Sequence, residues 1–405
     1  MAGNLLSVEE ALARVLAEAT PLPSVEVPLV EAHGRVLTAD MAARRTQPPD
    51  AVSSMDGYAV NAADAATAPV TLTVAGEVAA GRPFPRPLRR GEAARIFTGG
   101  VVPDGADAVI VQEQATRQGD SVTFSRPSAP GKNIRPKGLD FSQGDILFTK
   151  GYRLSSRDLA LIAAMNHPVA PVHRRPKVAI FATGDELVPP GSQPGPGQIV
   201  YSNGFALMAL LRSEGAEVVD LGIVADRQQD TVAAVRRARG LDADVLITTG
   251  GASVGDYDLV QDALKAEGMA LSFWRIAMRP GRPLMNGRLA GMHVLGLPGN
   301  PVSSYVCALL FAVPLLRRLQ GRADTEAEIE SAILGSDLAE NDERADYVRA
   351  ALTFDAAGQP IATPFPIQDS SMMGRLSRAG CLIVRPAHDK AVSAGGKVRI
   401  VKLPL

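Results

Sequence analysis

The sequence predicts a multidomain α/β protein with a central open, mostly parallel α/β domain, a β-rich second domain, a small linking domain and a C-terminal β-barrel-like domain. Three observations predict this fold class. Buried-strand runs alternate with helical stretches from about 176 to 325, short β-rich runs fill about 46 to 145, and short alternating segments follow after about 327. The 405 residues also exceed what a single hydrophobic core usually serves.

Composition narrows the classes of function. Hydrophobic residues make up 46% and charged residues 21%, as in folded proteins. The 42 basic residues nearly balance the 43 acidic ones, so the broad positive field of nonspecific nucleic-acid binding is absent and any bound anion is held locally. Cys307 and Cys381 are too far apart in sequence to indicate a disulfide framework or a zinc site. With no signal-peptide pattern and no uninterrupted apolar run of about 18 residues, we expect a cytoplasmic protein that does not enter membranes.

The first element is predicted to be a helix over about 8 to 19. Ser7 and Glu10 have the spacing of a capping box, in which each side chain accepts a hydrogen bond from the other residue's backbone. Pro21 and Pro23 then end the helix. One apolar stripe follows the helical period and consists of Val8, Leu12, Val15 and Leu16.

Strand patterns dominate the next 300 residues, in two different rhythms. From 46 to 145 the runs VTLTVAGEV, ARIFTGG and ADAVIVQEQ are separated by turn-rich stretches, which indicates a β-rich domain. From 176 to 325 the runs KVAIFAT, EVVDLGIV, DVLITTGG and HVLGLPG alternate with helical stretches, which indicates a mostly parallel sheet covered on both faces. Ligands bind such sheets at the carboxyl ends of the strands, where TGDE, TTGGASVG and LPGNP occur.

The last third of the chain predicts one long helix and a small β domain. The helix covers about 301 to 320 and is interrupted or kinked at Pro314, because proline removes a backbone hydrogen bond. Beyond it, DYVRAALTF, GCLIVRP and GKVRIVKL alternate apolar with polar residues, as in a barrel or a sandwich.

Two glycine-containing loops are candidates for phosphate binding. Gly250, Gly251, Ser253 and Gly255 follow an apolar strand, and glycines there let backbone N–H groups approach an anion. Gly299 and Asn300 precede Pro301, a favourable first-turn residue, so free N–H groups of a helix would face the same crevice. Either loop alone is equally compatible with a purely structural turn, but two in one domain favour a phosphate-bearing ligand. Neither matches the P-loop or the dinucleotide fingerprint.

Acidic side chains accompany these loops. A solvated surface carboxylate is the ordinary interpretation of any one of them. Those at strand ends would repel a phosphate unless a cation lay between, so the cluster predicts Mg²⁺ held by one or two carboxylates together with ligand oxygens, with Glu186, Asp226 and Asp258 as the candidate ligands. The five acidic candidates are Asp56, Asp140, Glu186, Asp226 and Asp258.

Positive charge is concentrated in the segment WRIAMRPGRPL. Arg275, Arg279 and Arg282 lie there, and guanidinium forks match tetrahedral oxyanions. A surface arginine cluster is the alternative interpretation. Together with the predicted metal, the arginines favour phosphoryl or oxyanion chemistry over hydrolysis by a catalytic triad, because no histidine accompanies a nucleophile elbow.

Taken together, these segments resemble the molybdopterin molybdenumtransferase family, which includes MoeA and the gephyrin E-domain. SSMDGYAV, IFTGG, RPKGLD, TGDEL, TGGASVGDYD, RPGRP and LPGNPVSS occur here in the family's order, over nearly the whole chain. MDGYA is the most specific motif, because the TGDEL, GGxSxG and PGNP signatures also occur in a wider set of molybdopterin-binding domains.

The resemblance implies an enzyme of molybdenum cofactor biosynthesis that uses Mg²⁺, inserts molybdate into adenylyl-molybdopterin and releases AMP. It also implies a homodimer, with each active site between the α/β domain of one subunit and the β-rich domain of the other. The implied domains are residues 1–20 plus 176–326 for molybdopterin binding, 21–45 plus 146–175 for linking, 46–145 for the β-rich domain and 327–405 for the C-terminal barrel.

Site residues are carried over motif by motif. Asp56 and Thr98 would reach the partner's site, and Asp140 lies in the matching RxxGxD motif. The implied catalytic residues are Asp56, Thr98, Asp140, Glu186, Asp226, Asp258, Arg275 and Arg279. The implied cofactor-binding residues are Thr183, Gly184, Gly250, Gly251, Ser253, Gly255, Arg282, Pro298, Gly299, Asn300, Arg344, Ser370 and Ser371.

The chain departs from the family pattern at its arginines. Many relatives carry lysine at the positions of Arg275 and Arg279, and often at that of Arg282. Arginine keeps the charge, so we expect molybdate binding to persist, but it lacks a titratable ammonium. A smaller departure is RAGCLI in the tail, where RANGLI or RANCLI is commoner.

Two other functions stay open at this stage. A molybdopterin adenylyltransferase would share the glycine loops but lack MDGYA and the extra domains. A non-catalytic carrier or scaffold would keep the crevice and lose turnover. Possible partners are the adenylyltransferase that supplies the substrate and the molybdoenzymes that receive the cofactor; we expect no nucleic acid and no membrane.

Overall fold

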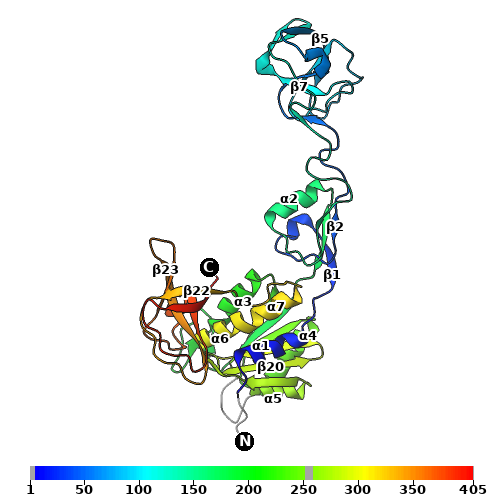
Figure 1. Ribbon diagram of the computed structural model, residues 1–405. Coiled ribbons are helices and arrows are strands. Elements are labelled where there is room, and N and C mark those ends of the chain that lie inside the picture. The colour runs from blue at the N-terminus through cyan, green and yellow to red at the C-terminus, as the bar shows by residue number, and fades with distance from the viewer. Residues whose placement is uncertain (1–4, 251–258, 405) are drawn as a thin grey trace. The chain divides into compact units, whose positions relative to one another are not determined.

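The computed structural model describes residues 5–250 and 259–404, which form two compact units (Figure 1). The first, called here the α/β-barrel unit, comprises Met1–Val25, Gly34–Val36 and Val172–Leu405. The second, called the β-rich unit, comprises Glu26–His33 and Leu37–Pro171. Strands β1 (Ser24–Pro28) and β12 (Val169–His173) pair where the chain passes from one unit to the other.

A six-stranded sheet, in the order β16-β13-β17-β21-β20-β18, forms the centre of the α/β-barrel unit. Its first four strands are parallel and coincide with the four predicted buried runs. Strand β20 pairs antiparallel with both β21 and β18, and this antiparallel pairing was not predicted. The strands are β13 (Lys177–Thr183), β16 (Glu217–Val224), β17 (Val245–Thr249), β18 (Ala270–Arg275), β20 (Pro283–Leu289) and β21 (Met292–Leu297).

Helices cover both faces of this sheet, as the buried runs require. On β13, Val178 and Ile180 face one core cluster, whereas Ala179 and Phe181 face the other, because side chains alternate along a strand. The first cluster includes α1 (Val8–Ala17), α3 (Asn203–Ser213), α6 (Pro301–Cys307) and α7 (Val313–Leu319); the second includes α4 (Gln228–Gly240) and α5 (Leu259–Ala266). The predicted capping box of α1 is confirmed, with Ser7 N donating to Glu10 Oε2 and Glu10 N to Ser7 Oγ.

The long helix predicted near 301–320 is confirmed, and so is its interruption. A π-helical segment, Ala308–Ala312, separates α6 from α7 and ends just before Pro314, whose ring cannot donate a backbone hydrogen bond. By length and composition the Pro301–Leu319 segment could cross a membrane, but 83% of its apolar window is buried inside the protein. It is therefore placed here as a core helix of the unit.

The C-terminal strands close into a five-stranded barrel. They pair in the order β23-β24-β22-β26-β25, and β25 pairs back with β23. A further two-residue strand, β19 (Met278–Arg279), leaves the α/β region and joins the edge of β23 in parallel. The barrel strands are β22 (Ile329–Leu334), β23 (Ala345–Phe354), β24 (Pro360–Pro364), β25 (Cys381–Arg385) and β26 (Lys397–Lys402), with the short helix α8 (Met373–Leu376) between β24 and β25.

The β-rich unit is built on a second six-stranded sheet, in the order β7-β4-β6-β5-β9-β8. Tyr58, Leu72 and Phe124 pack in its core. The strands are β4 (Gly57–Val60), β5 (Val70–Val78), β6 (Glu92–Ile96), β7 (Ala108–Val111), β8 (Ala115–Gln118) and β9 (Ser121–Phe124). Two short pairs, β3 (Val52–Ser53) with β10 (Ile134–Arg135) and β2 (Met41–Ala42) with β11 (Ile146–Phe148), and the helix α2 (Ser156–Ala164) complete the unit.

Candidate functional site

A crevice of about 650 Å³ lies at the carboxyl ends of β13, β17 and β21. The three strand-end loops meet there, as expected for a mostly parallel sheet. The crevice is lined by many of the residues predicted from the sequence, namely Thr183, Gly184, Glu186, Asp226, Gly250, Pro298, Gly299, Asn300 and Ser371. Asn203, which was not predicted, also lines it and donates from Nδ2 to Gly299 O at 2.6 Å.

Glycine is required at position 250, where these loops touch. Gly250 has a φ of +84°, and a Cβ there would overlap the carbonyl oxygen of Thr183. Gly299 lies against Gly250, at 3.5 Å from its would-be Cβ to Gly250 Cα. The loops after β17 and β21 therefore approach each other backbone to backbone, which leaves N–H groups near the crevice.

Two carboxylates line the crevice without a cation. Asp226 and Asp185 bind each other's backbone: Asp226 N donates to Asp185 Oδ1 at 3.0 Å and Asp185 N to Asp226 Oδ2 at 3.3 Å. Across residues 5–250 and 259–404, no lysine or arginine forms an ion pair with Glu186 or Asp226. Their negative charge is therefore available to a ligand or a metal ion.

Part of the predicted set lies outside the described residues: Gly251, Ser253, Gly255 and Asp258. The predicted Mg²⁺ ligands therefore reduce to Glu186 and Asp226 in what the structure describes. Within that part of the chain, no three acidic, histidine or cysteine side chains are grouped closely enough to hold a metal by themselves.

An apolar wall completes the crevice, and sequence reasoning missed it. Ile199 and Val200 form β15, which pairs in parallel with β14 (Leu187–Val188) and leaves Ile199 56% exposed. Next to them, the Tyr201 ring lies 5.9 Å from that of Phe205, and burial raises the Tyr201 pKa to about 12. Exposed apolar side chains at a polar crevice suit a flat ligand. The signal in the sequence was the apolar run QIVY after a proline- and glycine-rich stretch.

A loop from the barrel, Gln368–Met372, reaches the crevice and is called here the serine loop. Ser370 Oγ accepts from Asn300 Nδ2 at 3.0 Å, and Ser370 O accepts from Val302 N at 3.1 Å. Ser371 lines the crevice, and its hydroxyl donates to Asp369 Oδ1 at 2.5 Å. The hydrogen bonds from the Ser371 hydroxyl and backbone N–H hold the pKa of Asp369 below its usual value.

Arg279 and Arg344 are brought together by acidic residues that the sequence reasoning did not single out. Arg279 Nη2 lies 2.5 Å from Asp346 Oδ2, and Arg279 Nη1 lies 3.1 Å from Asp342 Oδ2. Arg344 Nη2 lies 2.6 Å from the same Asp342 oxygen. Hydrogen bonding from Arg344, with the charge of Arg279 adding to it, lowers the Asp342 pKa to about 2. The only signal for these pairs was the alternation of charge in ENDERAD.

The predicted arginines have different surroundings in the structure. Arg279 lines a cavity of about 550 Å³ in the barrel, with Asn341, Asp346 and Arg385, and not the crevice. Arg275 lies 4.2 Å over the Trp274 ring, and its buried Nε has no hydrogen-bond partner among the described residues. Arg282 is exposed.

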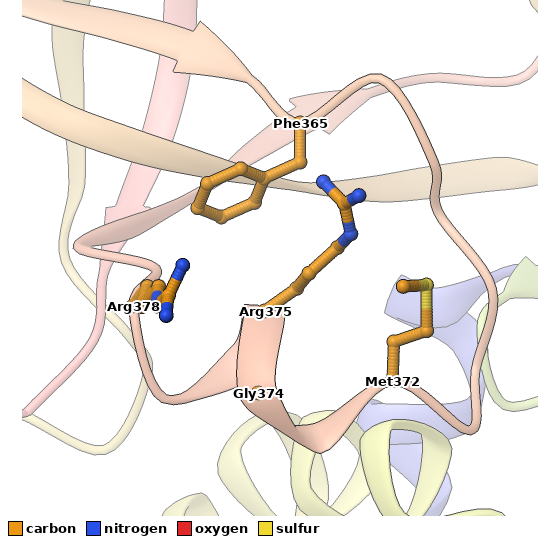
Figure 2. Close-up of a pocket in the computed structure, with 5 residues that line it drawn as sticks. All are labelled: Phe365, Met372, Gly374, Arg375 and Arg378. Carbon is orange, nitrogen blue, oxygen red and sulfur yellow. The ribbon is translucent and has the colours of Figure 1, made fainter.

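A third cavity, of about 420 Å³, adjoins the serine loop and is shown in Figure 2. It is lined by Phe365, Met372, Gly374, Arg375 and Arg378. The Arg375 guanidinium lies 5.9 Å from the centroid of the Phe365 ring. None of these residues was predicted to bind a ligand. Met372 belongs to the serine loop, so this cavity lies beside the loop.

In the β-rich unit the structure brings Asp56 and Thr98 together. Asp56 Oδ1 accepts from Thr98 N at 2.7 Å and from Thr98 Oγ1 at 2.8 Å, and these bonds hold the Asp56 pKa below its usual value. Asp56 is therefore an oriented, ionised and exposed carboxylate. Asp140 is also exposed, and its backbone N–H donates to Gln47 O at 3.0 Å.

Comparison with known proteins agrees with this geometry. Family models match along most of the chain: the MoeA N-terminal region (domains I and II) at residues 6–166, a probable molybdopterin-binding domain at 179–318 and the MoeA C-terminal region (domain IV) at 331–403. The molybdopterin molybdenumtransferase of Haemophilus influenzae is 35% identical over 98% of each chain. Molybdopterin molybdenumtransferase 2 of Mycobacterium tuberculosis is 36% identical over 93% of this chain and 94% of its own.

Solved structures show the same likeness. Two structures of a molybdopterin biosynthesis MoeA protein from Pyrococcus horikoshii match with TM-scores of 0.85 and 0.81. Their identities are 31% and 29%, and each match covers at least 98% of both chains. The agreement of sequence and fold over full length extends to every domain. This chain belongs to the MoeA family of molybdopterin molybdenumtransferases.

Proposed function

We propose that this protein inserts molybdate into adenylyl-molybdopterin, releasing AMP and molybdenum cofactor. The observation that carries the proposal is the crevice, where glycine loops, two carboxylates without cations and an apolar wall face one space of about 650 Å³. Such a space suits a flat pterin joined to a pyrophosphate. The names of the relatives support the transfer of molybdenum to molybdopterin, and the crevice supports a binding site for the substrate.

The chain's own residues bind and orient the nucleotide part of the substrate. Backbone N–H groups of the Gly250 and Gly299 loops, with the N-terminus of α6, hold the pyrophosphate. Thr183 supplies a further donor, because its buried hydroxyl faces this crevice and has no partner among the described residues. The pterin ring lies against Ile199 and Tyr201.

The carboxylates fit a magnesium ion. Mg²⁺ is usually held by one or two protein carboxylates together with phosphate oxygens and water, and Glu186 and Asp226 supply two carboxylates beside the proposed pyrophosphate. When bound, Mg²⁺ would neutralise the charge that develops on the leaving AMP. Asp258 is proposed as a third ligand from the family motif, and it lies outside the described residues.

Molybdate, the second substrate, is proposed to lie near the serine loop and the arginines. The Ser370 hydroxyl would donate to its oxygens, and so would the Ser371 hydroxyl once it leaves Asp369 Oδ1, while Arg275, Arg279, Arg282 and Arg344 supply the positive charge. The dithiolene sulfurs would form Mo–S bonds in place of Mo–O bonds, and the displaced oxygens would leave as water with protons from the thiols and the solvent. A water molecule would attack the phosphoanhydride, and AMP would leave. Fixed hydrogen-bond donors and charges would stabilise the transition state without a protein nucleophile.

Two chains are proposed to share each active site, in a cytoplasmic homodimer. The exposed, ionised Asp56 with Thr98 would face the crevice of the partner subunit. A mixture of Asp56→Asn and Asp226→Asn subunits, each inactive alone, should recover about a quarter of wild-type activity, because mixed dimers hold one intact site. No recovery after subunit exchange would contradict the shared site.

The direct test is AMP release by the purified protein given adenylyl-molybdopterin, Mg²⁺ and molybdate, with the product assayed by reconstitution of an apo-molybdoenzyme. Molybdate-dependent AMP release with active cofactor is expected. Tight binding without turnover would point instead to a carrier or scaffold. Consumption of ATP with free molybdopterin would point to an adenylyltransferase.

A further inference from the structure

We propose that Arg349 and Gln368 are positioning residues that fix the serine loop for molybdate. Neither side chain lines the crevice; both act through Ser370 and Ser371. The inference rests on the proposed function for the identity of the oxyanion. The geometry of the loop itself stands without it.

Arg349 is the largest fully buried side chain described and is only 1% exposed. It lies on β23, and the described part of the chain offers it no carboxylate at ion-pair distance. Burial lowers its pKa, and the more distant charge of Asp369 partly opposes this. A buried guanidinium without an ion pair is costly unless its donors are used. In the described part of the chain, the hydrogen bonds of its guanidinium go to the serine loop.

Gln368 joins the start of the loop to the barrel. Its side-chain amide binds both backbone groups of Arg349: Arg349 N donates to Oε1 at 3.0 Å, and Nε2 donates to Arg349 O at 3.0 Å. Arg349 Nε also donates to the same Oε1 at 3.2 Å. The Gln368 side chain thus takes the place of a strand neighbour just beyond the end of β24.

The other end of the loop is held by the same guanidinium. Arg349 Nη1 donates to Met372 O at 3.5 Å, so one side chain connects both ends of the Gln368–Met372 turn. Ser371 lines the crevice, whereas the Met372 side chain lines the cavity of Figure 2. The serine loop thus separates the crevice from this cavity. Its position depends on the hydrogen bonds of Arg349 and Gln368, which are called here the clamp.

Gln368→Met tests the clamp from its exposed side: methionine keeps the length of the side chain and removes the acceptor of Arg349 Nε, and thermal unfolding shows how much stability this costs. We expect the KM for molybdate to rise about tenfold, from lost hydrogen bonds and a mobile loop, with kcat changed less than about twofold. The matched control is Gln359→Met, an exposed glutamine of the same barrel in the turn before β24. It should leave both constants unchanged.

Arg349 is tested as a pair of variants. Arg349→Met should raise the KM for molybdate more than Arg349→Lys, because lysine keeps a donor and the charge. A purely structural role would instead lower the thermal midpoint in both variants without splitting KM from kcat. Equilibrium binding of molybdate to the variants should weaken in the same order.

Hydrogen exchange at Val302 gives a readout that needs no turnover. The Val302 N–H is in the first turn of α6 and has no helical acceptor, so among the described residues its hydrogen bond goes to Ser370 O, and burial of Val302 adds to its protection. Gln368→Met should speed its exchange, and Gln359→Met should not. Unchanged exchange and unchanged KM in Gln368→Met would overturn the inference. If the wild type shows no turnover while Gln368→Met speeds exchange of the Val302 N–H, the proposed function is rejected. The role of Arg349 and Gln368 in positioning the loop would then still stand.

Discussion

The crevice and the barrel differ in whether their charged side chains have partners of opposite charge. Glu186 and Asp226 line the crevice without a cation among the described residues, whereas Arg279 and Arg344 are already paired with Asp342 and Asp346. Uncompensated charge beside an open cavity indicates a place that a ligand completes. Compensated charge indicates donors that are held in position in advance. In the proposed reaction, the pyrophosphate of adenylyl-molybdopterin would therefore meet carboxylates that still lack a cation. Molybdate would meet arginines that acidic residues already hold in position.

Removing one crevice carboxylate should have the largest effect. Asp226→Asn is expected to slow AMP release by more than about a hundredfold, because it removes a charge from the metal and phosphate site, while the thermal midpoint stays within a few degrees. Steady-state AMP assays and thermal unfolding check this. Asp262→Asn, an exposed carboxylate on α5, is the control. Full turnover in Asp226→Asn would remove the crevice from the proposed site.

A second variant tests how closely the crevice loops are packed. Gly250→Ala combines a positive φ with overlap of Thr183 O and should destabilise the protein by about 3 kcal/mol or more. Gly291→Ala shares the positive φ, +89°, but its Cβ would meet nothing within 4 Å, so a loss of about 1 kcal/mol is expected. Denaturant unfolding measures both. Equal losses would mean that backbone strain alone matters at Gly250.

The barrel pairs predict a dependence on pH. Because Arg344 and Arg279 hold the Asp342 pKa near 2, below its ordinary 3.8, ionised Asp342 stabilises the folded state above about pH 4. That contribution is lost as the pH falls through about 2. Asp342→Asn should lower the thermal midpoint at pH 5 and converge with the wild type near pH 2. A constant difference across this range would show that Asp342 acts through shape and not charge.

The smallest effect is expected from Arg279→Lys, which introduces the lysine that the family resemblance implies at this position. Arg279 contacts Asp346, Asp342 and Asn341 with three different nitrogens, and lysine has only one. Because the side chain is 45% exposed, we expect less than about 1 kcal/mol of lost stability. Molybdate binding should persist. A larger loss, measured by chemical denaturation, would mean that the barrel depends on this arginine.

Local patterns predicted the elements well. The runs at 177–183 and 217–224 are strands β13 and β16 residue for residue, and the Ser7–Glu10 capping box begins α1 as expected. The meeting of the TGDE, TTGG and PGNP loops followed from strand direction alone. These features depend on residues close in sequence or on a general rule of sheet topology.

Long-range pairing could not be predicted in the same way. The antiparallel strands β18 and β20 flank a segment whose arginines drew attention as one cluster. Residues 278–279 pair with β23, some 67 residues later, and this carries Arg279 into the barrel while Arg275 stacks on Trp274. The Asp342 contacts and the wall at Ile199 likewise arise only once distant segments meet.

The two-residue strand β19 joins the barrel to the α/β region. Through it the barrel takes an edge from the α/β region, and the buried Tyr347, Leu382 and Val401 of the barrel share a core cluster with Leu315 of α7. The barrel is therefore not an independently folding domain that can be separated from the α/β region. Calorimetry of the α/β-barrel unit should show a single cooperative transition, and exchanging barrels between relatives should fail unless the Ile276–Arg279 segment is exchanged with them.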